Sequence, residues 1–265
     1  MKYKHLLSIK DFSELTGISQ SKLRYYDEMK LFKPTKRDDN GYRYYSLPQT
    51  IAANCVNIMS SLNIPMKKYN EFKKEKSPEL ILELLQKQGS ELNKELYRLQ
   101  QAYALIHTYC EMIREGLQAD EKAITTCWMA SVSIELGAEN DFSSGDFYDS
   151  FFVFLKQMAA QRVDPAYPAG GYYRDMDAFA NQPGFPTRYF SHAPTGRDVK
   201  EAGKYLVGYT RGYYGNIGDL PQRMLAHASE HGLLTHGPVY EMYLHDEVAV
   251  EDPEQYLIQA SVMVS

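Results

Sequence analysis

Residues that could recognise a charged organic molecule gather in the last part of the chain. Glu241 stands in the otherwise apolar segment VYEMYL, between Tyr240 and Tyr243. Aromatic rings attract cations through their quadrupole, and a carboxylate removed from water supplies a full counter-charge. A lone acid in a strand is more often a solvated residue on the outer face, so the segment by itself leaves both interpretations open.

Further aromatic side chains are available to complete such a site. Of the 22 tyrosines, 12 lie beyond residue 121, together with the only tryptophan. Tyr205, Tyr209 and Tyr213 are spaced by four, so one strand would place them on a common face. The candidate ligand-binding set is Glu241, Tyr205, Tyr209, Tyr213, Tyr243, Trp128, Tyr148 and Tyr173.

The segment that carries these residues, 120–265, is predicted to be an α+β domain. Its two halves show the same order of strand, helix, strand and strand. In the first half we expect these elements at 125–135, 146–161, 171–176 and 187–192. In the second half we expect them at 203–214, 220–231, 238–245 and 256–264. The duplicated order predicts one curved antiparallel sheet with the helices on one face.

Metal, cofactor and nucleophilic chemistry find weaker support. His227 and His231 are four apart on a predicted helix, as a zinc pair would be, but no clear third ligand follows. Cys55, Cys110 and Cys127 form no CxxC pair. No Ser-His-Asp or Cys-His arrangement has a recognisable local signature. The sequence therefore predicts no catalytic residue, no metal site and no cofactor.

Charge divides the chain into a basic head and an acidic body. Residues 1–76 carry 15 Lys and Arg against 8 Asp and Glu, whereas residues 77–265 carry 14 against 26. This asymmetry indicates that the head meets a polyanion and the body does not. No signal-peptide-like apolar stretch opens the chain, and no run approaches the ~20 apolar residues of a membrane helix, so we expect a cytoplasmic protein.

The basic head, residues 1–76, is predicted to contain a helix-turn-helix and a hairpin. Ser8 and Ser19 are good N-caps for two short helices, and Asn40-Gly41 is a strong hairpin signal. A basic helix beside a basic hairpin suits duplex DNA, with one element in the major groove and the other on phosphates. The candidate DNA-binding set is Gln20, Lys22, Arg24, Tyr25, Lys36, Arg37, Arg43 and Tyr44.

A long helix is predicted to connect head and body over residues 77–119, beginning at Ser77-Pro78. Its apolar side chains recur with a seven-residue period over five heptads. A helix of about 40 residues spans about 60 Å, so this seam is too long for a small globular contact. Dimerisation is the straightforward use, through Leu85, Leu92, Leu96, Leu99, Ile106 and Ile113.

The strings LRYYDEMKLFKP and NGYRYYS strongly resemble the MerR family of bacterial transcription regulators, over about Leu7 to Tyr69. The resemblance implies a winged helix-turn-helix head and an antiparallel two-helix coiled coil that joins two protomers. It places Tyr26 on or beside the recognition helix, whereas the helical periodicity of that residue favours a core position. Metal sensors of the family carry cysteine pairs near the end of the long helix, and these are missing here.

The strings GKYLVGYTRGYY and GPVYEMYL resemble the GyrI-like effector domain. In the multidrug-sensing, BmrR-like branch of the family, the glutamate of a VYE string lies at the floor of an aromatic pocket and faces cationic drugs. The resemblance therefore implies that role for Glu241. It further implies a homodimeric activator that binds a lipophilic, cationic or aromatic compound and distorts promoter DNA so that RNA polymerase can engage it.

Two other functions remain open on the sequence. Some GyrI-like domains are similar to hydrolases that use a pocket glutamate and a tyrosine, a role that Glu241 could fill with Tyr205 or Tyr209. The chain could also be a DNA-bending protein whose body binds no ligand. Turnover of a bound compound would favour the first alternative, and the absence of ligand-induced stabilisation would favour the second.

Overall fold

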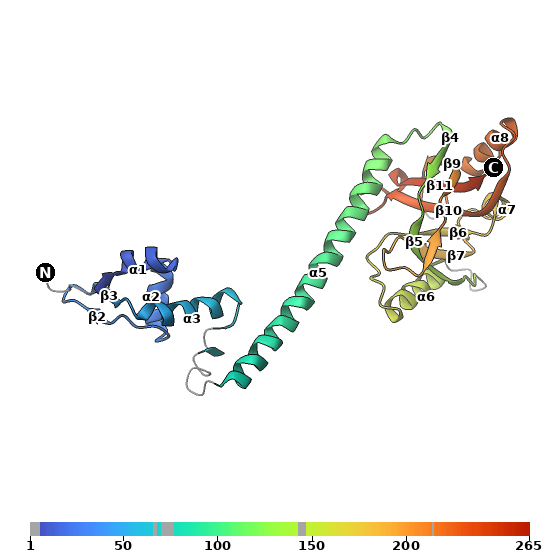
Figure 1. The fold of residues 1–265 in the computed structure, drawn as a ribbon. Coiled ribbons are helices and arrows are strands. Elements are labelled where there is room, and N and C mark those ends of the chain that lie inside the picture. Colours follow the sequence, from blue (N-terminus) through green and yellow to red (C-terminus); the bar gives the residue numbers. More distant parts are fainter. Residues whose placement is uncertain (1–5, 66–67, 70–76, 143–146, 214) are drawn as a thin grey trace. The chain divides into compact units, whose positions relative to one another are not determined.

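The computed structural model describes residues 6–65, 68–69, 77–142, 147–213 and 215–265 (Figure 1). The chain divides into two compact units, which we call the N-terminal unit (up to Arg98) and the C-terminal unit (from Leu99). Helix α5 (Pro78–Gln118) contributes to both units. Within the described part of the chain, no helix has an apolar stretch of the length that a membrane span requires.

The N-terminal unit combines three helices with a small antiparallel sheet. The helices are α1 (Ile9–Thr16), α2 (Gln20–Glu28) and α3 (Gln49–Ser61). The sheet has the order β1-β3-β2, formed by β1 (Leu6–Ser8), β3 (Arg43–Ser46) and β2 (Lys36–Arg37). The multidomain fold with a winged helix-turn-helix head is therefore confirmed.

The local signals of the N-terminal unit act as the sequence predicts. The Asp11 amide donates a hydrogen bond to Ser8 Oγ over 3.2 Å, and the Lys22 amide donates one to Ser19 Oγ over 3.2 Å. Gly41 adopts a φ of 79°, which lets the β2–β3 hairpin turn without strain. Tyr26 is 1% exposed, so its core position is confirmed.

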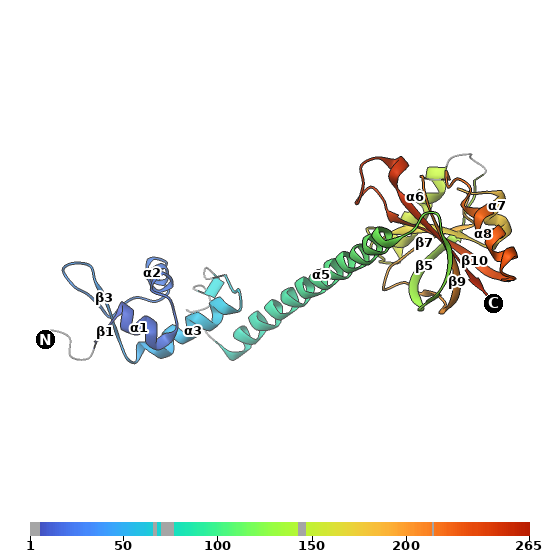
Figure 2. The same cartoon turned by 90° about the horizontal axis from the view of Figure 1, so that it is seen from above.

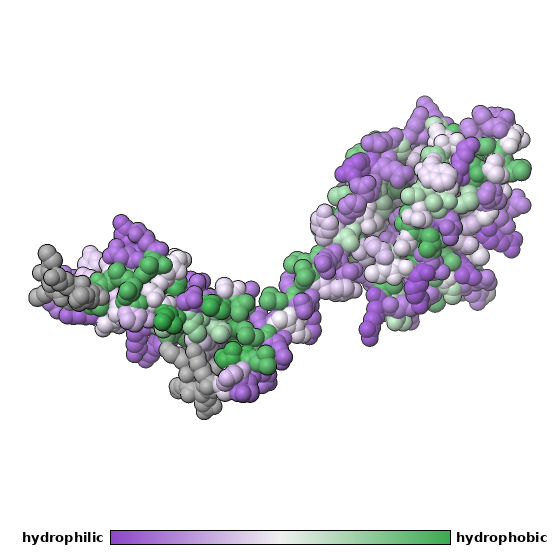
Figure 3. All heavy atoms as spheres, viewed as in Figure 1, coloured by the Kyte–Doolittle hydropathy of each residue, from purple (hydrophilic) through white to green (hydrophobic). Residues whose placement is uncertain are grey.

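Helix α5 leaves most of its heptad seam uncovered in the single chain. The seam residues Leu96, Leu99 and Ile106 are more than half exposed, whereas Ile113 is half-buried. Figure 3 shows hydrophobic and hydrophilic residues both reaching the surface along this helix. An apolar stripe of this length is unfavourable in water, so it agrees with a partner helix, and dimerisation stays a prediction.

The C-terminal unit is built on an eight-stranded antiparallel sheet in the order β4-β9-β11-β10-β6-β7-β5-β8. The strands are β4 (Ile124–Met129), β5 (Val132–Glu139), β6 (Ala169–Tyr173), β7 (Arg188–Ser191), β8 (Asp198–Lys200), β9 (Gly203–Arg211), β10 (Thr235–His245) and β11 (Leu257–Val264). The predicted antiparallel α+β fold is confirmed.

Several boundaries differ from those that we expected. The single strand expected at 125–135 is two strands, β4 and β5, which lie far apart in the strand order. The alternating pattern continues through Ala130 and Ser131, so periodicity could not reveal the turn there. Strand β9 ends before Gly212, whose φ of 154° an L-residue rarely adopts, and Tyr213 consequently lies beyond the strand.

Three helices cover one face of the sheet, namely α6 (Phe147–Ala160), α7 (Met176–Asn181) and α8 (Leu220–Glu230). Helices α7 and α8 contact each other and pack on β6, β9 and β10 (Figure 2). The end of α5 instead contributes Met112 to the core on the opposite face. Our expectation that the helices of this domain lie on one face therefore holds for α6, α7 and α8, and it did not include α5.

Candidate functional site

A cavity of about 450 Å³ opens between the sheet and α6 in the C-terminal unit. Its floor comes from β6 and β10, and its walls come from α6, from the segment 165–169 and from α5. Most of the lining is apolar or aromatic, and the aromatic members are Tyr109, Tyr148, Phe151, Tyr167, Tyr173, Tyr189 and Tyr243. Cavities of this size and character accept drug-sized molecules.

Glu241 lies at the floor of this cavity and is only 3% exposed. The Tyr173 hydroxyl donates a hydrogen bond to Glu241 Oε2 over 2.7 Å, and it accepts one from the Gly184 amide over 3.0 Å. Burial raises the pKa of Glu241, while hydrogen bonds from Tyr173 and Tyr243 favour its charged form and pull the pKa down. The solvated outer-face interpretation of Glu241 is therefore wrong.

Gly171 leaves space beside the carboxyl group of Glu241. Gly171 of β6 pairs with Glu241 on one side and with Tyr189 on the other, so the three residues cross the sheet on one face. A β-carbon at Gly171 would lie 3.5 Å from Glu241 Oε2 and 3.1 Å from Pro186 Cβ. Burial, followed by the charge of Glu241, raises the pKa of the Tyr189 hydroxyl. The bare backbone at Gly171 thus keeps the floor open around the acid.

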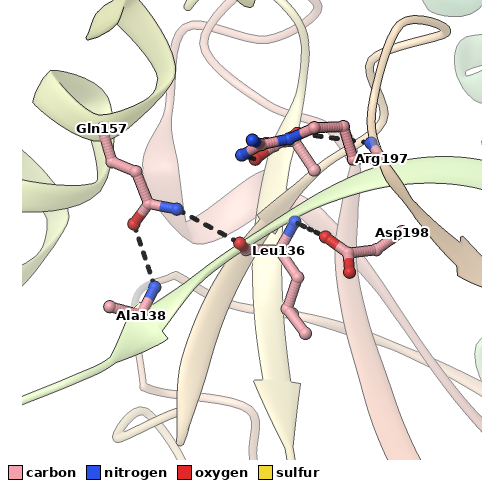
Figure 4. A network of polar contacts seen from close by, with 6 residues as sticks. Leu136, Ala138, Gln157, Arg197 and Asp198 are labelled. Carbon is pink, nitrogen blue, oxygen red and sulfur yellow. Dashed lines mark hydrogen bonds and ion pairs between the residues drawn. The ribbon is translucent and has the colours of Figure 1, made fainter. Parts of the chain in front are cut away.

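Helix α6 is held against the sheet by polar contacts to strand β5 (Figure 4). Gln157 accepts a hydrogen bond from the Ala138 amide over 3.0 Å and donates one to the Leu136 carbonyl over 3.3 Å. The Leu136 amide donates in turn to Asp198 over 3.0 Å. These contacts place the α6 side chains that line the cavity, which are Tyr148, Phe151 and Leu155.

The structure brings four of the eight predicted ligand-binding residues to the cavity: Glu241, Tyr148, Tyr173 and Tyr243. The other four, Tyr205, Tyr209, Tyr213 and Trp128, do not line it. Tyr205 is buried in the core on the opposite face of the sheet, and Tyr209 donates a hydrogen bond to Glu115 of α5 over 3.3 Å. Trp128 is 74% exposed on β4.

Sequence reasoning missed several lining residues. Tyr189 and Phe151 were missed because the sequence does not show which strands pair with β10 or where the helix of Phe151 packs on the sheet. Tyr109 lies in the helix that we assigned wholly to dimerisation. Asp246 and Glu247 follow the end of β10, beyond a register shift that the sequence does not reveal. The one signal that could have suggested Asp246 and Glu247 is that two acids directly follow a predicted strand.

The weaker sequence motifs also have clear positions. The ring of His227 in α8 stacks at 4.0 Å on that of His231, which follows the helix, and neither residue lines the cavity. Among the described residues, no group of three or more His, Cys, Asp and Glu side chains is placed to hold a metal ion.

The candidate DNA-binding residues of the N-terminal unit lie on α2 and on the β2–β3 hairpin. Four are exposed, namely Arg24, Tyr25, Lys36 and Arg37. The other four, Gln20, Lys22, Arg43 and Tyr44, are half-buried. Lys22 Nζ donates a hydrogen bond to Asn57 Oδ1 of α3 over 3.4 Å, which orients its ammonium group.

Asp27 of α2 anchors the hairpin and was not singled out from the sequence. Its Oδ2 forms ion pairs with Arg37 Nη2 at 2.5 Å and with Arg43 Nε at 2.7 Å. The Asp27 side chain is 2% exposed, whereas that of Arg37 is 54% exposed. One buried carboxylate thus holds two hairpin arginines on α2 and leaves a net positive charge in this cluster.

Comparisons with known proteins identify similar sequences and structures. Residues 8–45 match the family described as MerR family regulatory protein. The multidrug-efflux transporter 2 regulator of Bacillus subtilis (strain 168) is 24% identical over 250 residues, which cover 92% of this chain and 91% of that protein.

Among solved structures, EcmrR in a complex with DNA aligns over 98% of this chain and 99% of that chain, with 15% identity and a TM-score of 0.40. SAV2435 bound to tetraphenylphosphonium aligns over 54% of this chain and 94% of that chain, with 16% identity and a TM-score of 0.34.

Proposed function

From its place in the MerR family of regulatory proteins, to which the chain belongs, we propose that it is a ligand-responsive transcription regulator. As a dimer it binds promoter DNA through α2 and the β2–β3 hairpin, and it binds a lipophilic, cationic or aromatic compound in the cavity of the C-terminal unit. The observation that carries the ligand assignment is the buried carboxyl group of Glu241 at an aromatic floor.

The electrostatics of the floor favour a cationic compound. Glu241 is a desolvated acid, and an ionised carboxylate in a low-dielectric site is costly without a counter-charge. A lipophilic cation supplies that charge and at the same time buries its rings against Tyr148, Phe151 and Tyr189. The relative in Bacillus subtilis is named as a regulator of a multidrug-efflux transporter, which supports a ligand of this kind.

The DNA assignment rests on the N-terminal unit. The match to the MerR family covers α1, α2 and most of the β2–β3 hairpin. The exposed Arg24, Tyr25, Lys36 and Arg37 give this surface the positive charge that phosphates require. The ligand-bound dimer then bends and untwists the promoter, so that RNA polymerase can engage both of the promoter's recognition elements.

The hydrolase alternative is less well supported by the geometry. It pairs Glu241 with Tyr205 or Tyr209, and neither tyrosine lines the cavity. The hydroxyl that does reach Glu241 belongs to Tyr173, and it already bridges Glu241 and the Gly184 amide. We therefore retain the binding function.

The test compares one lipophilic monocation with one neutral aromatic compound of similar size by calorimetry. Glu241→Gln should keep the fold and the DNA affinity but weaken cation binding by about 2–4 kcal/mol, because one partner of a buried charge pair is lost. Binding of the neutral compound should change much less. Glu254→Gln removes an exposed charge outside the cavity and serves as the control. Equal small losses for both compounds in Glu241→Gln would contradict the proposal.

A further inference from the structure

Strand β10 contains a bulge between the floor of the cavity and its rim. Tyr243 pairs with Ile258 and His245 pairs with Leu257, so Leu244 is an extra residue on β10. Before the bulge, Glu241 and Tyr243 face the cavity, and Tyr240 and Met242 face the opposite core. Leu244 belongs to that opposite core as well, and His245 turns toward α5, where its Nε2 lies 3.1 Å from the Ile113 carbonyl oxygen.

The extra residue reverses the alternation that follows it. In an uninterrupted strand, position 246 would lie on the same face as Tyr240 and Met242. With the bulge, Asp246 lies on the cavity side, and both Asp246 and Glu247 line the cavity. β10 and the two residues after it thus present carboxyl groups to one cavity at two levels, Glu241 at the floor and Asp246 with Glu247 at the rim.

Asp246 and Glu247 lack an ion-pair partner in the described part of the chain. Asp246 is half-buried, and its Oδ1 accepts the Val248 amide over 3.0 Å, which fixes the orientation of the carboxyl group.

One aromatic residue, Tyr109 of α5, lines the cavity together with these acids. Burial, and then the charges of Asp246 and Glu247, raise the pKa of Tyr109 to about 12, so this ring lies within their electrostatic reach. The rim therefore repeats the combination found at the floor, which is a carboxyl group beside an aromatic ring.

We propose that the rim formed by Tyr109, Asp246 and Glu247 binds a second cationic group, so that the preferred ligands are elongated molecules with a cation at each end. The inference rests on the proposed function, because the first cation is the one that Glu241 binds. Asp246 follows Glu241 by five positions, one of which is the bulge residue, so the two levels are separated by about 13 Å of extended chain. A single compact cation cannot reach both levels at once.

The test uses decamethonium and decyltrimethylammonium, the latter below its micelle-forming concentration. The two compounds share the decyl chain and differ in the second ammonium group. The wild-type chain should bind decamethonium about tenfold more tightly, because a second charge pair, at the half-buried Asp246, adds to the first. Asp246→Asn with Glu247→Gln should remove about tenfold of decamethonium affinity and change decyltrimethylammonium affinity less than about twofold.

The matched control is Glu251→Gln with Glu254→Gln, which removes two exposed charges that do not line the cavity and should leave both affinities unchanged. Equal affinity of the wild-type chain for the two compounds, or an unchanged decamethonium affinity in the rim variant, would overturn the inference. In that case a loss of monocation binding in Glu241→Gln would still support the proposed function. Binding of neither compound to the wild-type chain would contradict the proposed function and this inference together.

Discussion

The imidazole ring of His245, at the end of β10, packs directly on the backbone of Gly116 in α5, with no space for a β-carbon between them. One residue away, Glu115 accepts hydrogen bonds from Tyr209 of β9 and from Gln259 of β11. Helix α5 also carries Tyr109 to the cavity and continues into the heptad seam. The contacts of Glu115 and Gly116 therefore fix α5 on the sheet, and the same helix lines the cavity and carries the heptad seam.

The first prediction concerns this junction. Gly116→Val places two methyl groups where the His245 ring lies, so we expect the free energy of unfolding of the C-terminal unit to fall by about 1–3 kcal/mol. A β-carbon at Gly89, in the part of the same helix that belongs to the N-terminal unit, would have no neighbour within 4 Å, so Gly89→Ala should not lower the stability of the C-terminal unit. Urea unfolding followed by near-ultraviolet circular dichroism measures both, and an unchanged midpoint for Gly116→Val would contradict the packing argument.

The second prediction is a pH dependence set by Glu241. Because burial raises the pKa of this carboxyl group, the folded chain holds its proton more tightly than the unfolded chain does. The contribution of Glu241 to the free energy of unfolding should therefore decrease as pH rises through the raised pKa. A cation needs the ionised carboxylate, so cation affinity should increase over the same range, with release of a proton on binding. Glu241→Gln should abolish both effects.

Tyr173→Phe sharpens this test. The Tyr173 hydroxyl donates to Glu241 and favours the charged form, so its removal should move the pH profile of cation binding to higher pH. Tyr240→Phe changes a neighbouring tyrosine on the opposite face and should leave the profile in place. Calorimetry in two buffers of different protonation enthalpy measures the proton release. Cation binding that is independent of pH in the wild-type chain would disprove the electrostatic role of Glu241.

The N-terminal unit was predictable from the sequence because its signals are local. Ser8, Ser19 and the Asn40-Gly41 turn each act within four residues, and the structure places all of them as expected. The Asp27 ion pairs escaped prediction because they join residues 10 and 16 positions apart, on elements whose relative placement the sequence does not state.

The cavity was predictable only in part, for the same reason. Glu241 and its flanking tyrosines could be found in one short string, but the partner of the carboxylate, Tyr173, lies 68 positions away on another strand. Tyr205 and Tyr209 share a four-residue spacing with Tyr213, which pointed to a common face, but they belong to β9, which is separated from β10 by β11. The bulge at Leu244 depends on pairing between β10 and β11, so no alternation pattern could assign Asp246 to the cavity.

The third prediction concerns the heptad seam of α5. Leu96 and Leu99 are more than half exposed in the single chain, so charged substitutions there should leave the fold of each chain intact. Leu96→Lys with Leu99→Lys places charges in the apolar seam, and we expect a monomer in sedimentation and a loss of operator binding. Tyr97→Lys, on the same turn but outside the seam positions, is the control and should remain dimeric. A dimeric double variant would move the interface to another surface.

The last prediction concerns Asp27, where two effects on DNA binding have opposite signs. Asp27→Asn removes a negative charge from the DNA-binding surface, which alone would strengthen attraction to phosphates. It also breaks the ion pairs that hold Arg37 and Arg43 on α2, and the pair with Arg43 is the stronger one because its side chain is only 22% exposed. We expect the second effect to win, with a loss of about 1–3 kcal/mol in the stability of the N-terminal unit and weaker binding to a duplex from the chain's own promoter.

Asp39→Asn makes the same charge change at an exposed position of the hairpin and should bind DNA at least as tightly as the wild type. Fluorescence anisotropy at two salt concentrations separates charge from geometry, and identical behaviour of the two variants would show that Asp27 acts on DNA binding through its charge alone.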